Sequence, residues 1–169
     1  PVTAFANGAV IATAIAISPE FLPFQLLLMG FYALEYVSNV DGAPIRLSSF
    51  GAGLFCAAIF LFVITVPPAD YLVVRCDTYS ASFALALILA GTTFAALPGV
   101  GLLCRWQTRA CAVAASGALS ATLIVLLFPQ CLDGAYADLA PDIRDRFVNH
   151  IGQEMSFLQR GDFVLSENI

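Results

Sequence analysis

The chain has 169 residues, of which 60% are apolar and 11% charged, and its mean hydropathy is +0.87. Soluble domains carry about 25% charged residues, so this composition nearly excludes a water-soluble globular protein. All seven basic residues are arginines and the formal net charge is −5, which excludes most nucleic-acid binders, because these need a basic face to displace counterions. The composition predicts an all-α, polytopic membrane protein.

The first part of the chain contains two apolar runs, residues 2–17 and 21–37, separated by Ser18, Pro19 and Glu20. Proline removes a backbone donor, and the residue before it leaves the helical conformation. We therefore expect two membrane crossings joined by a tight turn. One long kinked helix is the alternative.

Three later runs, residues 47–66, 81–103 and 111–128, are apolar throughout. Each has about the 20 residues that a helix needs to cross the hydrocarbon of a bilayer. The sequence thus predicts a bundle of about five transmembrane helices over residues 1–129. The chain begins at Pro1 without a signal peptide's basic segment and cleavage site, so we expect a fragment of a longer protein.

Residues 130–169 have a different composition, with seven acidic residues against three arginines. Pro141 and Asp142 suit the first turn of a helix. Apolar residues then recur at helical spacing, namely Ile143, Phe147, Ile151, Met155 and Leu158. The sequence predicts an acidic extramembrane tail that contains an amphipathic helix lying on the bilayer or against the bundle.

The arginines predict the orientation of the bundle, because short cytoplasmic loops retain positive charge. With five crossings, Arg46, Arg105 and Arg109 fall on one side, and Arg75 and the tail fall on the other. We expect the first side to be cytoplasmic and the tail to lie on the opposite side of the membrane.

Cys76 and Cys131 each follow an apolar run by a few residues and fall on the same predicted face. In an oxidising compartment these two thiols can form a disulfide. The sequence alone does not decide between a disulfide and two free thiols. A catalytic redox pair is disfavoured, because the chain has no Cys-x-x-Cys motif to lower a thiol pKa.

Glu20 is the first candidate for a functional carboxylate, because it is flanked by apolar residues at or near membrane depth. Ionisable groups there usually face a protein interior or a water-filled cavity. A helix-capping carboxylate is the alternative. For Glu35, beside Tyr36 at the other end of the same apolar run, we expect an interfacial position.

Motifs for metal or cofactor chemistry are missing from the sequence. His150 is the only histidine, with no second ligand at zinc spacing. Gly51 and Gly53 lie inside an apolar run, where small residues favour close helix packing rather than phosphate binding. We expect neither a metal nor a cofactor.

Three runs together carry a resemblance to a known family: ISPEFLPF at residues 17–24, PPAD at 67–70 followed by Cys76, Asp77 and Ser80, and FPQCLDG at 128–134. On these the chain resembles bacterial polytopic membrane proteins similar to GT-C-type glycosyltransferases. Such enzymes move a sugar from a polyprenyl-phosphate carrier to an acceptor at the outer face of the inner membrane.

The resemblance implies a cavity at the outer helix ends, lined by Glu20 and roofed by the loops that contain Cys76 and Cys131. It implies a bacterial inner membrane with the C-terminal tail in the periplasm. It also implies a polyprenyl-phosphate sugar and membrane lipid as partners, and an acidic catalytic pair upstream of Pro1. The chain departs from the family pattern at Ala135, where proline is common, and at Gln153, where an acid is expected. A non-catalytic membrane module, such as a transporter part or an assembly subunit, is the alternative function.

Overall fold

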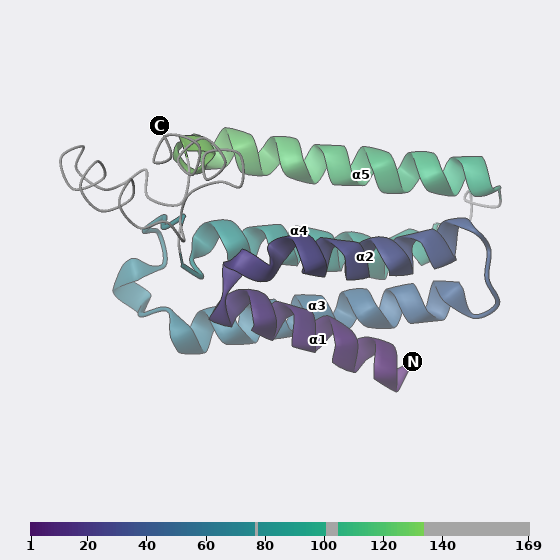
Figure 1. Ribbon diagram of the computed structural model, residues 1–169, viewed down its shortest axis with the longest axis horizontal. Coiled ribbons are helices and arrows are strands. Elements are labelled where there is room, and N and C mark those ends of the chain that lie inside the picture. The colour runs from purple at the N-terminus through teal and green to yellow at the C-terminus, as the bar shows by residue number, and fades with distance from the viewer. Residues whose placement is uncertain (77, 101–104, 134–169) are drawn as a thin grey trace, which may run out of the picture.

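The computed structural model describes residues 1–76, 78–100 and 105–133, and these form five α-helices joined by short turns and 3-10 helices. The α-helices are α1 (Val2–Ile17), α2 (Leu22–Val37), α3 (Ala43–Thr65), α4 (Ala81–Ala96) and α5 (Trp106–Leu127). They lie along one common axis and alternate in direction (Figure 1). The all-α helix bundle predicted from the sequence is confirmed. The predicted amphipathic helix of the tail, with His150 and Gln153, lies outside the described residues.

Three of the described helices are long and apolar enough to cross a membrane: α3 with 23 residues, α4 with its 3-10 extension to Gly99 with 19, and α5 with 22. The chain is therefore a membrane protein. Helices α1 and α2 have 16 residues each, which corresponds to about 24 Å at 1.5 Å per residue. That is shorter than the bilayer hydrocarbon of about 30 Å, so five crossings stay a prediction.

The N-terminal segment is a helical hairpin rather than one kinked helix. Helix α1 ends where Ser18 adopts an extended conformation, with φ −151° and ψ 104°. The 3-10 helix η1 (Pro19–Phe21) follows, and α2 then runs back in the opposite direction (Figure 1). The proline-marked break thus reverses the chain, as expected for two helices.

The structure moves several predicted boundaries. Helix α3 begins at Ala43 instead of residue 47, because Pro44 is tolerated in the first turn of a helix, where its missing N–H is not needed. Helix α4 ends at Ala96, well before residue 103, and continues as the 3-10 helix η3 (Leu97–Gly99). Pro98 lies in η3 and cannot donate to an α-helical hydrogen bond. Helix α5 begins at Trp106, five residues earlier than predicted.

Helix α3 lies at the centre of the packing, between α1 and α4. Gly53 faces the backbone of Phe5 on α1, and Gly51 faces the backbone of Gly91 and Ala95 on α4, so closely that neither glycine leaves room for a Cβ atom. This confirms that the Gly-x-Gly pair serves helix packing. Around these crossings lies the apolar core, which includes Phe50.

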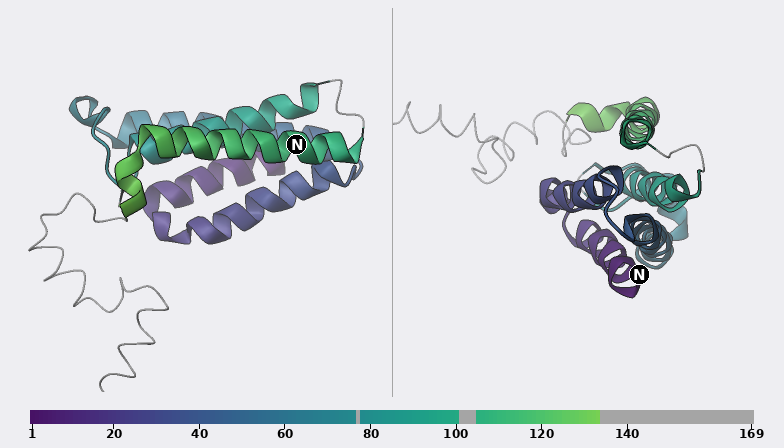
Figure 2. Two further views of the ribbon diagram at one scale, coloured as in Figure 1. Left: turned by 90° about the horizontal axis from the view of Figure 1, so that it is seen from above. Right: turned by 90° about the vertical axis from the view of Figure 1, so that its right-hand side faces the viewer.

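Helix α5 is attached to the bundle differently. It contacts α4 and α2 and stands apart from the other four helices (Figure 2). None of its residues is buried by the described part of the chain. Its side chains therefore face mostly away from the other described helices.

Candidate functional site

Three connecting segments meet at one end of the bundle, on the left in Figure 1. They are η1, the segment between α3 and α4 that includes η2 (Pro68–Asp70), and η4 (Pro129–Asp133). The alternating helix directions bring these segments together, although they are far apart in the sequence. Glu20, Cys76 and Cys131 therefore lie at the same end, as the sequence predicts.

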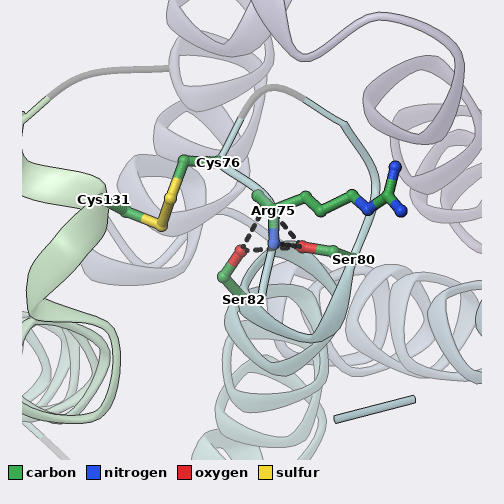
Figure 3. The surroundings of a disulfide bond; sticks show 5 residues. All are labelled: Arg75, Cys76, Ser80, Ser82 and Cys131. Atoms are coloured by element: carbon green, nitrogen blue, oxygen red, sulfur yellow. Dashed lines mark hydrogen bonds between the residues drawn. A yellow bond between two sulfur atoms is a disulfide. The ribbon is translucent and has the colours of Figure 1, made fainter. Parts of the chain in front are cut away.

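A disulfide joins Cys76 to Cys131 (Figure 3). The two Cα atoms are 5.3 Å apart, although the residues are separated by 55 positions in the sequence. The bridge ties the segment after α5 to the segment before α4. The cysteines Cys56 and Cys111 are free and exposed, so the two thiols outside the apolar runs are the ones that pair.

Beside the disulfide, two serines of α4 and its N-terminal boundary hold the backbone of Arg75 (Figure 3). The Arg75 N–H donates to Ser80 Oγ at 3.2 Å, and the Ser80 hydroxyl donates to the Arg75 carbonyl at 2.6 Å. Ser82 adds a longer bond of 3.4 Å to the same carbonyl. Both serines are buried. Their hydroxyls fix the Arg75 main chain, while its side chain extends away from the disulfide.

Sequence reasoning missed the role of Ser80. A serine directly before an apolar helix is a typical N-cap signal, and Ser80 does occupy the N-cap position of α4. Its side chain makes no capping bond to the helix. The hydroxyl bonds instead to the backbone of Arg75, five residues earlier, and no sequence pattern predicts these bonds.

Two tyrosines attach the same segment to α3. The Tyr79 hydroxyl donates to the Ala58 carbonyl at 2.8 Å, and burial raises the pKa of Tyr79 from 10.0 to about 12. Tyr71 donates to the Val63 carbonyl at 3.4 Å, and its ring stacks on Phe62 with the centroids 5.0 Å apart. The segment is therefore fixed to α3, to α4 and to the end of α5.

A polar pocket of about 250 Å³ lies within this framework. Its lining comes from the end of α3 and the following segment: Thr65, Val66, Pro67, Asp70, Val73, Arg75, Thr78, Tyr79 and Ser80. Asp70 and Arg75 supply a carboxylate and a guanidinium, and within the described residues no ion pair joins them. The pocket therefore presents a cation, an acceptor and several hydroxyls at the end of two membrane-spanning helices.

Glu20 does not line this pocket. It lies on η1, is exposed, and makes no hydrogen bond or ion pair with any residue that the structure describes. It lies at the predicted end of the bundle, but outside the segment that lines the pocket. A role for Glu20 in a cavity stays a prediction.

Three arginines of the described residues, Arg46, Arg105 and Arg109, lie at the opposite end of the bundle. Arg46 Nε is 3.1 Å from a carboxylate oxygen of Glu35. Arg109 donates to the Tyr36 carbonyl at 3.1 Å and to Asn39 Oδ1 at 2.7 Å, and its guanidinium carbon lies 5.0 Å from the centroid of the Tyr36 ring. Glu35 thus pairs with an arginine at a helix end rather than lining the polar pocket.

Within residues 1–76, 78–100 and 105–133, no group of three or more His, Cys, Asp or Glu side chains could hold a metal ion. Compared with family models, curated proteins and solved structures, the chain matches none.

Proposed function

We propose that the chain is the membrane-embedded part of a glycosyltransferase that moves a sugar from a polyprenyl-phosphate carrier to an acceptor at the periplasmic face. The observation that supports this proposal is the polar pocket at the disulfide-tied end. It combines the guanidinium of Arg75 with the carboxylate of Asp70 beside membrane-spanning helices. A lipid-linked donor presents its phosphate and sugar at the level of such a pocket, while its chain stays in the bilayer.

In this proposal Arg75 binds the phosphate, since a guanidinium forms charge-assisted hydrogen bonds with phosphate oxygens. Asp70 accepts hydrogen bonds from sugar hydroxyls. The acceptor oxygen attacks the anomeric carbon, the bond from that carbon to the phosphate oxygen breaks, and polyprenyl phosphate leaves with the electron pair. Arg75 stabilises the charge on this leaving group.

The transfer also needs a carboxylate that takes the proton of the acceptor. The family resemblance assigns this base to an acidic pair upstream of Pro1, with Glu20 as a helper at the same end. If Glu20→Gln leaves transfer unchanged in the full-length protein, Glu20 has no part in the reaction.

The proposal is tested by transfer from a polyprenyl-phosphate-linked radioactive sugar in membranes that contain the full-length protein. Hydrogen bonds to charged groups contribute about 1.5–3 kcal/mol, so Arg75→Gln should lower kcat/KM about 10- to 100-fold. Arg46→Gln, at the opposite end of the bundle, is the matched control and should retain the wild-type value. Equal values for both variants would contradict the proposed site.

An assembly subunit without catalytic activity is the second candidate. It is favoured by α5, none of whose residues is buried by the described part of the chain, so that a helix surface is left for another membrane protein. This alternative predicts no transfer by the full-length protein and a stable complex of larger mass in mild detergent.

A further inference from the structure

The arginine-rich end of the bundle contains a second pocket, distinct from the one at the disulfide. It has a volume of about 810 Å³ and lies between the end of α2 and the start of α5. Val37, Ser38 and Asn39 line it from α2 and the following turn, and Arg105, Trp106 and Gln107 line it from the start of α5.

Among the three arginines at this end, Arg105 differs in its surroundings. Arg46 is paired with Glu35, and Arg109 is held by a backbone carbonyl and the side chain of Asn39. Arg105 is exposed, and within the described residues no ion pair or side-chain hydrogen bond involves its guanidinium. The pocket therefore contains a cation that the described fold does not neutralise.

The neighbouring side chains fit an anion at the membrane surface. Trp106 is 61% exposed, and tryptophan concentrates at the level of the lipid headgroups. Ser38, Asn39 and Gln107 add groups that can donate hydrogen bonds to phosphate oxygens. Helix α5, which begins here, is long and apolar enough to span the bilayer, and none of its residues is buried by the described part of the chain. In a bilayer its outer face would lie against lipid.

We propose that this pocket binds the phosphate of an anionic phospholipid, with Arg105 as the main contact and Trp106 beside it. The same chemistry could hold free inorganic phosphate, but the lipid is favoured because the pocket opens next to a helix that faces the bilayer. This site is independent of the proposed transfer reaction, which concerns the other end of the bundle.

Trp106 is the only tryptophan in these 169 residues. Any tryptophan elsewhere in the protein is replaced by phenylalanine, so that the fluorescence reports on this pocket alone. The wild-type protein is reconstituted in vesicles of phosphatidylcholine and phosphatidylglycerol, with either lipid brominated in turn to quench Trp106. One basic residue near an anionic surface contributes about 1 kcal/mol, which corresponds to about a fivefold preference for phosphatidylglycerol. Arg105→Gln should bring the preference to about one, and Arg105→Lys should retain most of it.

Arg75→Gln is the matched control, because it removes one arginine from the opposite end and should keep the fivefold preference. Equal quenching by both lipids in the wild-type protein would overturn the proposal. A preference that survives in Arg105→Gln, or one that also disappears in Arg75→Gln, would overturn it too. If inorganic phosphate abolishes the preference while chloride at the same ionic strength does not, free phosphate is the ligand and the lipid proposal is wrong.

Discussion

Removal of the Cys76–Cys131 disulfide should destabilise the protein strongly, and replacing both cysteines by serine avoids a new free thiol. The bridge closes a loop between residues 55 positions apart. For a flexible chain of that length, loop-closure entropy predicts a stabilisation of about 4 kcal/mol. In detergent the denatured chain keeps much of α4 and α5 helical, so fewer residues are free and we expect a loss of about 2–4 kcal/mol.

The structure explains why packing would not compensate for this loss. None of the residues of α5 is buried by the described part of the chain. Its hydrogen bonds at the end opposite the disulfide include those from Arg109 to Tyr36 and Asn39. Without the disulfide, the C-terminal end of α5 keeps few contacts with the bundle.

The assay is unfolding in mixed micelles, followed by the fluorescence of Trp106 at the start of α5. Cys111→Ser is the matched control, since Cys111 lies on the same helix and is a free, exposed thiol. The double variant should unfold at lower denaturant than this control, and reducing agent should shift the wild-type protein in the same direction. If the double variant and Cys111→Ser unfold at the same midpoint, the disulfide does not hold α5.

Three further predictions concern packing and charge. Gly53→Ala should lower the free energy of unfolding by about 1–3 kcal/mol, because a Cβ at this position collides with the α1 backbone. The control Gly30→Ala has nothing within 4 Å of the added Cβ and should be neutral or stabilising by up to about 1 kcal/mol. An equal loss of stability in both variants would contradict the packing of α3 on α1. Tyr79→Phe should remove from the tyrosine absorbance titration the component whose pKa is about 12. Because the unfolded chain loses this proton at lower pH, the Tyr79 contribution to stability should decline as the pH rises from 10.0 to about 12. An unchanged titration would refute the burial of its hydroxyl. Glu35→Gln should lower the free energy of unfolding by less than about 1 kcal/mol, since the side chains of Arg46 and Glu35 are 34% and 22% exposed. The difference in stability between the wild-type protein and this variant should become smaller at high salt. A larger loss that does not depend on salt would be inconsistent with a surface ion pair.

Hydropathy predicts the existence of the helices well, because it reports how strongly a segment prefers apolar surroundings to water, whether lipid or protein provides those surroundings. For the same reason it could not predict how the helices pack. Helices α3 and α5 are similarly apolar, yet α3 is central, whereas none of the residues of α5 is buried by the described part of the chain. The predicted helix boundaries differ from the structure where a proline either begins a helix, as Pro44 does, or lies in a 3-10 turn, as Pro98 does.

The candidate site was predictable in its location but not in its construction. Alternating helix directions place Glu20, Cys76 and Cys131 at one end, and this follows from counting apolar runs. The bonds from Ser80 to the backbone of Arg75 and from Tyr79 to the Ala58 carbonyl depend on three-dimensional contacts that no local pattern encodes. As a result, sequence reasoning selected Glu20, whereas the polar pocket of the structure contains Asp70 and Arg75.

Photo-cross-linking would test directly whether this pocket receives the lipid-linked sugar. A polyprenyl-phosphate sugar with a diazirine on the sugar is added to membranes that contain the full-length protein, and the labelled peptides are identified by mass spectrometry. We expect label in residues 65–80, reduced in Arg75→Gln and suppressed by excess unlabelled donor. Label confined to other segments, or label in residues 65–80 that neither the variant nor the competitor reduces, would contradict the proposed site.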